Sequence, residues 1–372
     1  MKRIGIITTW NVPNYGAFLQ AYALQKVISA IKPDYEVLQI PHISRKHYNL
    51  YYSLVNTNHK YFFFNPKFYI KNFLRLIDFK NIKRVRNFLN YYKRFIPHCN
   101  SDSIEEVNKF DKIILGSDII WDYTVFFNKN DRYLFGNNLN VPIISSYATS
   151  FGSIDIEKNR PPNYVIDSLK TMKDISVRDE KSYNNVNKLV DRDAKIVLDP
   201  TFLFDWNEIT NDMTNSECLN NHKYAVVYGS YYSKDIISDF IKYCKSNNMK
   251  IICLDSYRDN FEWCDQTIEL GHITPFEWLN YVKNSEIVLT STFHGLVLSI
   301  ILNKKLIFSQ TKFIKNKSEW LIKQLELEEP IFNNNSFKEK LEYKWDFQKI
   351  NNKLQLLKED SLNYLKQALS DN

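Results

Sequence analysis

The sequence predicts an α/β protein of two domains, each built on a parallel β-sheet. Strand and helix patterns alternate along most of the chain, which is typical of parallel strands joined by crossover helices. The 372 residues are more than one ordinary hydrophobic core accommodates, and they suit two domains. Residues 206–222 are rich in Asn, Asp and Thr, interrupt the alternation, and are expected to be a linker.

The N-terminal domain is expected to span residues 1–205. A run of β-branched residues predicts its first strand at 3–9, and an apolar stripe predicts a helix at 17–30. The remaining elements expected here are strands at 36–40, 111–115, 141–147, 175–177 and 194–198, and a helix at 161–173.

A basic and aromatic helical insert is expected within this domain at residues 60–96. Residues 60–94 hold ten Lys or Arg, eleven Phe or Tyr and a single acid, so the rest of the chain has a net charge of −2. The side chains expected to face inward are Ile70, Phe73, Leu74, Ile77, Val85, Phe88, Leu89 and Tyr92. The insert could pack on the first domain with a solvated basic face, or lie on an anionic membrane surface. Nucleic-acid binding is the least favoured alternative, and no nucleic-acid partner is predicted.

The C-terminal domain is expected to span residues 223–340, followed by a C-terminal helical segment at 341–372. Thr274 and Glu277 form a capping-box pattern with a proline between them, which predicts a helix start. The expected strands are 224–228, 250–254, 286–290 and 305–308, and the expected helices are 233–245, 275–283, 296–303 and 351–369.

The turn at residues 291–295 is the strongest candidate for a functional site. It follows a short apolar strand and precedes an apolar helix, and open α/β sheets bind ligands at the carboxyl ends of their strands. His294 would bring an imidazole, which ordinarily titrates near neutrality. Gly295 would allow close backbone approach, and the N–H groups of the helix start could hold an anion. The alternative is a hydrogen-bonded histidine with a purely structural role.

Composition excludes several other classes. Eight glycines are about a third of ordinary usage, and none are spaced as in dinucleotide or nucleotide triphosphate loops. The five cysteines have no zinc or redox spacing, and no metal or cofactor is predicted. The first strand is too short and too soon interrupted to be a signal peptide, and no membrane span is readable. A cytoplasmic location is therefore expected.

Six segments, in the order in which they occur, resemble the polysaccharide pyruvyl transferase family. They cover roughly residues 3–310, and the insert and the C-terminal tail lie outside the resemblance. The segments are residues 4–17, 114–121, 145–152, 175–179, 198–201 and 291–295.

This resemblance implies a glycosyltransferase-B-like architecture of two Rossmann-like domains with a cleft between them. It implies transfer of pyruvate from phosphoenolpyruvate to a sugar, as a ketal across two hydroxyls. It also implies that Arg178 and His294 hold the donor. Thr292 stands where the family has an arginine, and Lys304 and Lys305 or the backbone N–H groups of the turn are the candidates to replace that cation.

The predicted site follows from these positions. His294 and Asp118 are the catalytic candidates, and Arg178 would bind the donor phosphate with the turn. Structural alternatives stay open for each: an ion pair with Asp179 or Glu180 for Arg178, and an Asx-type turn for Asp118. The further donor-binding candidates are Ser291, Thr292 and Gly295, and the acceptor-binding candidates are Asn11, Asn14, Tyr15 and Gly16.

Two aromatic residues and one acidic strand end are assigned to structure. Trp121 and Tyr123 are expected in the core, and Asp199 is expected to be a structural strand exit. The acceptor is expected to be a saccharide, including a lipid-linked one, which would place the protein at the inner face of the membrane. Two rival functions stay open: a glycosyltransferase that uses a nucleotide sugar, and a non-catalytic saccharide-binding protein.

Overall fold

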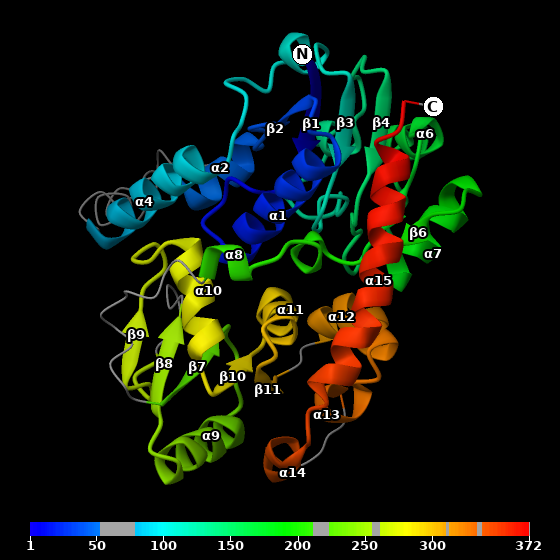
Figure 1. The fold of residues 1–372 in the computed structure, drawn as a ribbon. Helices are drawn as coiled ribbons and strands as arrows, with labels where there is room; N and C mark the ends of the chain where they lie inside the picture. The colour runs from blue at the N-terminus through cyan, green and yellow to red at the C-terminus, as the bar shows by residue number, and fades with distance from the viewer. Residues whose placement is uncertain (53–78, 211–222, 255–260, 310–311, 333–336, 372) are drawn as a thin grey trace. The chain divides into compact units, whose positions relative to one another are not determined.

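The computed structural model describes residues 1–52, 79–210, 223–254, 261–309, 312–332 and 337–371 (Figure 1). The chain divides into two compact units. Unit 1 consists of Met1–Pro200 and Ser361–Asn372, and unit 2 consists of Thr201–Asp360. The first boundary falls five residues before the expected end at 205. The C-terminal helix is shared between the two units, where a separate segment at 341–372 was expected. Most of the expected linker, 211–222, lies outside the described residues.

Unit 1 is built on a four-stranded parallel sheet in the order β2-β1-β3-β4. β3 is fully buried and β1 is buried over its last four residues, as expected for strands covered on both faces. Isolated bridges at Thr149 connect the end of β3 to a short parallel pair, β5 and β6. The strands are β1 (Lys2–Ile7), β2 (Tyr35–Gln39), β3 (Lys112–Leu115), β4 (Ile143–Ser146), β5 (Ser176–Val177) and β6 (Lys195–Ile196).

Several helices of unit 1 begin at side-chain caps. Asn14 caps α1 and Asp179 caps α7, each accepting a hydrogen bond from a backbone N–H of the first turn. Trp121 and Tyr123 are buried, as predicted. The helices are α1 (Tyr15–Ile31), α2 (Arg45–Tyr51), α4 (Phe79–Phe95), α5 (Ile104–Val107), α6 (Asn163–Thr171) and α7 (Glu180–Val190), with the end of α15 (Phe347–Ala368).

Unit 2 is built on a five-stranded parallel sheet in the order β11-β10-β7-β8-β9. The capping box at Thr274 and Glu277 is confirmed. The strands are β7 (Tyr224–Tyr228), β8 (Lys250–Leu254), β9 (Gln266–Ile268), β10 (Ile287–Thr290) and β11 (Lys305–Phe308). The helices are α8 (Asn207–Thr210), α9 (Lys234–Ser246), α10 (Pro275–Asn284), α11 (Phe293–Ile301), α12 (Lys312–Gln324), α13 (Glu328–Phe332), α14 (Phe337–Glu342) and the first part of α15.

Each of the two larger sheets has one switch point, a pair of neighbouring strands from which the chain adds further strands in opposite directions. In unit 1 the chain builds outward from β1 to β2 on one side and from β3 to β4 on the other. In unit 2 the corresponding neighbours are β7 and β10. Open α/β sheets bind ligands at such switch points, outside the carboxyl ends of the two strands. The residues that follow these four strands are therefore the candidates for ligand binding.

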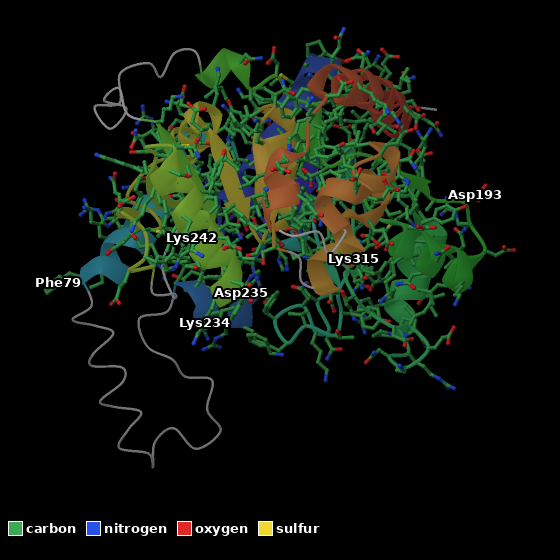
Figure 2. The ribbon with its side chains drawn as sticks, turned by 90° about the horizontal axis from the view of Figure 1, so that it is seen from below. Phe79, Asp193, Lys234, Asp235, Lys242 and Lys315 are labelled. Carbon is green, nitrogen blue, oxygen red and sulfur yellow. The ribbon has the colours of Figure 1, made fainter. Side chains whose placement is uncertain are left out.

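The basic insert is described only in its second half, as α4. Phe88 and Tyr92 are buried, as predicted, but Leu89 is 39% exposed, so that part of the predicted inward face is wrong. Phe79, at the start of the helix, projects outward (Figure 2). The inward residues predicted between 70 and 77 lie outside the described residues. No helix in the described ranges has the length and apolar character needed to span a membrane.

Candidate active-site residues at the two switch points

His294 lies at the switch point of unit 2, in the first turn of α11. The predicted turn is shorter than expected, because Thr292 caps the helix and Phe293 already belongs to it. The Thr292 hydroxyl accepts a hydrogen bond from the Gly295 N–H at 3.0 Å. A helix start at Leu296 was therefore wrong by three residues, and the half-buried His294 side chain is held by helical backbone.

Gly295 is required by packing inside the turn. A Cβ atom at this position would lie 2.1 Å from Thr290 Oγ1 and 2.7 Å from Thr292 Oγ1. Thr290 Oγ1 is itself fixed by donating to the Tyr228 carbonyl at 2.7 Å. The space on the Cβ side of Gly295 is thus filled by two threonine hydroxyls, which gives Gly295 a structural role, and its expected part in donor binding stays a prediction.

Ser291 joins the turn to the neighbouring strand of the switch point. Its hydroxyl accepts from the Ser230 N–H at 2.9 Å and donates to the Ser230 carbonyl at 2.7 Å. A side chain at Gly229 would meet Ser291 Oγ at 2.4 Å, so the two loops pack in direct contact. Ser291 and Thr292 were expected to bind the donor, but their hydroxyls build the turn. The groups of the turn that stay candidates for the donor are the His294 imidazole and the first N–H groups of α11.

Tyr231 was missed by the sequence analysis. It follows Gly229 and Ser230 in the loop after β7, its backbone is left-handed with φ of 64°, and its side chain is 86% exposed. A bulky residue in that region is uncommon and points to a constrained loop. No sequence signal distinguishes Tyr231 from the other tyrosines of the chain, which has 24. It is neither a glycine nor an asparagine, the residues that most often adopt a left-handed backbone.

Arg178 is buried in unit 1 between two carboxylates. Its Nη1 donates to Asp199 Oδ2 at 2.9 Å and its Nη2 donates to Asp118 Oδ1 at 3.2 Å. Burial alone would lower the pKa of this guanidinium, but the two carboxylates outweigh burial and raise it. The side chain is only 3% exposed. Both terminal nitrogens are bound to carboxylates of the protein, and the predicted forked contact with a donor phosphate stays a prediction.

Asp118 lies at the switch point of unit 1, three residues after the end of β3. Its side chain is 24% exposed, whereas that of Asp199 is 1% exposed. The backbone of Asp118 is left-handed, with φ of 76°. The predicted candidates Asp118 and Arg178 are thus brought into contact by the fold, and Asp118 is the more accessible member of the pair.

The predicted acceptor residues near β1 have mainly structural roles. Asn14 Oδ1 caps α1 by accepting from the Ala17 N–H at 3.0 Å. Tyr15 and Gly16 are buried inside the first turn of this helix, where a loop was expected. These contacts give the three residues structural roles, and their expected part in acceptor binding stays a prediction. Asn11 is half-buried in the loop after β1 and stays a candidate.

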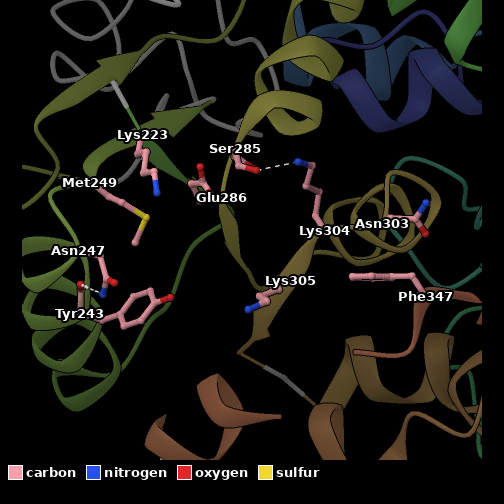
Figure 3. A pocket seen from close by; sticks show the side chains of 10 residues that line it. All are labelled: Lys223, Tyr243, Asn247, Met249, Ser285, Glu286, Asn303, Lys304, Lys305 and Phe347. Carbon is pink, nitrogen blue, oxygen red and sulfur yellow. Dashed lines mark hydrogen bonds between the residues drawn. The ribbon is translucent and has the colours of Figure 1, made fainter. Parts of the chain in front are cut away.

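Lys304 and Lys305 lie at the wrong edge of the sheet to replace the family's arginine. β10 and β11 pair in parallel with Ile287 beside Lys305, so the lysines lie at the amino ends of the strands, and His294 follows the carboxyl end of β10. The strand between these ends spans about 10 Å. Figure 3 shows both lysines with Lys223 around a pocket of about 300 Å³ at that edge. Lys304 donates to the Ser285 carbonyl at 2.8 Å, just past the end of α10, where a cation offsets the helix dipole.

No group of His, Cys, Asp or Glu side chains suited to holding a metal ion occurs within the described ranges. The four cysteines in those ranges form no disulfide.

A sequence model of the polysaccharide pyruvyl transferases matches residues 14–309, which is most of the chain. The chain therefore belongs to the polysaccharide pyruvyl transferase family, and it is a transferase of that family. No curated protein sequence matches the chain.

Solved structures with similar folds have very different sequences. A Listeria monocytogenes protein assigned as a UDP-N-acetylglucosamine 2-epimerase has a TM-score of 0.53 and 8% identity, over 99% of this chain and 91% of that chain. MnaA of S. aureus, in a structure with UDP, has a TM-score of 0.51 and 10% identity, over 99% and 91% of the two chains. At these identities the likeness concerns the fold alone, and it confirms the predicted glycosyltransferase-B-like α/β class.

Proposed function

We propose that this protein transfers pyruvate from phosphoenolpyruvate to a saccharide, as a ketal across two hydroxyls, in the synthesis of a cell-surface polysaccharide. The observation that carries the proposal is the position of His294. The family match includes this residue, and the fold puts it at the switch point of unit 2, where an α/β sheet binds its ligand. No further cofactor is needed, because the donor itself carries the leaving group.

The proposed chemistry is an addition followed by a substitution. The methylene carbon of the enol gains a proton, and the first sugar hydroxyl adds to the adjacent carbon and loses its proton. The bond from that carbon to the phosphate oxygen then breaks, and phosphate leaves with one proton. The second hydroxyl adds to the same carbon and loses its proton, which closes the ketal. One proton is taken up by carbon and one by phosphate, and the two hydroxyls supply both.

His294 is the proposed acid that delivers the proton to carbon, because imidazole can hold and release a proton near neutral pH. The start of α11 would favour the negative charge of the donor through its N–H groups and dipole. Asp118 is the proposed base that accepts a hydroxyl proton. Its carboxylate is partly exposed at the switch point of unit 1, and Arg178 holds it from the buried side.

A nucleotide sugar is the second candidate donor. The resemblance implies that Thr292 stands where the family has an arginine, and the turn would then carry one cation fewer for a phosphoenolpyruvate phosphate. The similar S. aureus structure is a complex with UDP, which makes uridine diphosphate a suitable probe. Stabilisation by a nucleotide sugar and not by phosphoenolpyruvate would favour this alternative.

We further propose a saccharide carried on a lipid as the acceptor, with the protein at the cytoplasmic face of the membrane. The feature that supports this proposal is the basic face of α4, on which Lys83, Arg86, Lys93 and Arg94 are exposed. An amphipathic basic helix of this kind suits an anionic lipid surface.

The experiment is a phosphate-release assay with phosphoenolpyruvate and a panel of methyl glycosides and lipid-linked saccharides, with products identified by mass spectrometry. We expect a product heavier than its acceptor by one pyruvyl ketal. We expect Asp118→Asn to lower the turnover at least about a hundredfold, as for a lost acid–base group. The control is Asp167→Asn, an exposed carboxylate on α6. Phosphate release without a ketal product, or near-normal turnover by Asp118→Asn, would contradict the assignment.

A further inference from the structure

We infer that Asp199 is a positioning residue for the proposed reaction: it fixes Arg178 so that Arg178 in turn aims the Asp118 carboxylate. The inference rests on the proposed function for its catalytic meaning and on the geometry of unit 1 for its structural content. It changes the role expected from the sequence, in which Asp199 was only a strand exit.

The three charged groups form a chain from the interior to the surface. Asp199 Oδ2 accepts from Arg178 Nη1 at 2.9 Å, and Asp118 Oδ1 accepts from Arg178 Nη2 at 3.2 Å. The exposed fractions of the side chains are 1% for Asp199, 3% for Arg178 and 24% for Asp118. Asp118 is therefore the member placed to meet a substrate hydroxyl, and the other two act through it.

Asp199 also holds the backbone segment that carries Asp118. The Ser117 hydroxyl donates to Asp199 Oδ2 at 3.4 Å, and Ser117 directly precedes Asp118 in the chain. The Ser117 carbonyl accepts from Thr8 Oγ1 at 2.9 Å, and this hydrogen bond connects the ends of β1 and β3 at the switch point. One carboxylate oxygen of Asp199 thus reaches both the residue before Asp118 and the guanidinium behind it.

This arrangement has an energetic reason. A guanidinium at a buried site must be paired, and its planar fork can serve two acceptors at once in fixed directions. The left-handed backbone at Asp118 also needs surrounding contacts to hold it. A neutral amide at position 199 would weaken the hydrogen bond from Arg178 Nη1, because a carboxylate accepts from a guanidinium more strongly than an amide does, and the guanidinium could rotate away from Asp118. A base displaced by about 1 Å can lose on the order of a hundredfold in rate.

The test compares Asp199→Asn with Asp179→Asn in the full-length protein. Asp179 is a matched control, since it is also buried, adjoins Arg178 in sequence, and caps α7 through the Ser182 N–H at 2.8 Å. The first measurement is the ¹⁵N spectrum of the Arg178 guanidinium, identified by its absence in Arg178→Lys. The second is kcat and KM for phosphoenolpyruvate with a methyl glycoside that supports turnover.

We expect separate, slowly exchanging Nη1 and Nη2 signals in the wild type and in Asp179→Asn, and averaged signals in Asp199→Asn. We expect Asp199→Asn to lower kcat by about a hundredfold while KM for phosphoenolpyruvate changes less than about threefold. If Asp199→Asn does not fold, Arg178→Lys replaces it in the kinetic arm, since it keeps the charge but loses the fork.

The two proposals fail in different ways. If the wild type releases no phosphate with any methyl glycoside or lipid-linked saccharide of the panel, the proposed function fails, and the Arg178 signals alone decide whether Asp199 positions the guanidinium. Unchanged Arg178 signals in Asp199→Asn would overturn the inference. So would a normal kcat in Asp199→Asn, or an equal loss of kcat in the Asp179→Asn control.

Discussion

Nη2 of Arg178 donates to Oδ1 of Asp118 across 3.2 Å, and this contact changes the role of both residues. The sequence presents each as a separate candidate, Arg178 as a ligand for the donor phosphate and Asp118 as a base. In the fold Arg178 is buried behind Asp118 and is held from its other side by Asp199. The His294 turn of unit 2 is therefore the main candidate for binding the phosphate of the donor.

Arg178→Gln should destabilise the protein by about 3–5 kcal/mol, because it leaves the buried Asp199 carboxylate without its cation. The measurement is the urea dependence of unfolding, with the midpoint compared between the two proteins. Lys188→Gln, which removes a fully exposed pair with Glu157, is the control and should leave the midpoint unchanged. Equal midpoints for Arg178→Gln and the wild type would show that the buried network contributes little.

Gly295→Ala should disrupt the His294 turn, because the new Cβ would overlap Thr290 Oγ1 and Thr292 Oγ1. We expect a loss of about 1–3 kcal/mol in unfolding free energy, as for other overpacked sites, together with weaker binding of phosphoenolpyruvate by calorimetry. Thr292→Ser keeps the capping hydroxyl and should change neither quantity. Wild-type stability in Gly295→Ala would mean that the turn accommodates a side chain.

His42 should make the stability of the protein depend on pH. The imidazole lies between Asp102 and Asp131, with 2.9 Å from Nδ1 to Asp102 and 2.9 Å from Nε2 to Asp131. Burial alone would lower its pKa, but hydrogen bonds to these two carboxylates raise it from 6.5 to about 9. A raised folded-state pKa stabilises the fold fully below pH 6.5, and this contribution is lost as the pH rises through about 9.

The expected loss between pH 6.5 and pH 9 is on the order of 3 kcal/mol, measured by urea unfolding at several pH values. His42→Gln should flatten the profile over that window. The control is His47→Gln. Burial lowers the pKa of His47 to about 4, so His47 affects the pH dependence of stability only at pH values below about 6.5. A wild-type profile that stays level between pH 6.5 and 9 would show that the His42 contacts do not persist in solution.

Replacing Lys83, Arg86, Lys93 and Arg94 by Gln should weaken binding to anionic vesicles at least about tenfold, because each surface cation contributes about 1 kcal/mol near such a membrane. Arg84 is left in place because it is buried. The control variant replaces Lys234, Lys242, Lys245 and Lys250, exposed lysines of unit 2, and two of these are labelled in Figure 2. Equal loss in both variants would contradict a specific role for α4.

Local patterns predicted the sheets well and the long-range contacts poorly. The bounds of β7, β8 and β11 agree with the alternation of apolar residues, and the position of His294 after a buried strand was predicted correctly. The partners of Arg178 lie 21 and 60 residues away in the chain, and no local pattern carries that information. β9, of three residues, is too short for a clear period.

The loop after β1 shows how two local signals compete. The apolar stripe predicted a helix from residue 17, but Asn14 caps a helix that already includes Tyr15 and Gly16. Burial of Tyr15 against Phe88 of α4 favours the helix, and that contact joins segments distant in sequence. The same competition occurs in unit 2. Thr292 caps α11, so the helix begins at Phe293, earlier than the apolar run from Leu296 predicted.

A thermal-shift titration of the wild type and His294→Ala with phosphoenolpyruvate tests whether the His294 turn binds the donor. We expect saturating phosphoenolpyruvate to raise the melting temperature of the wild type. His294→Ala should melt at the same temperature as the wild type without ligand and show a much smaller rise. An equal rise in both proteins would remove His294 from the donor site. A response to nucleotide sugars alone would contradict the proposed donor.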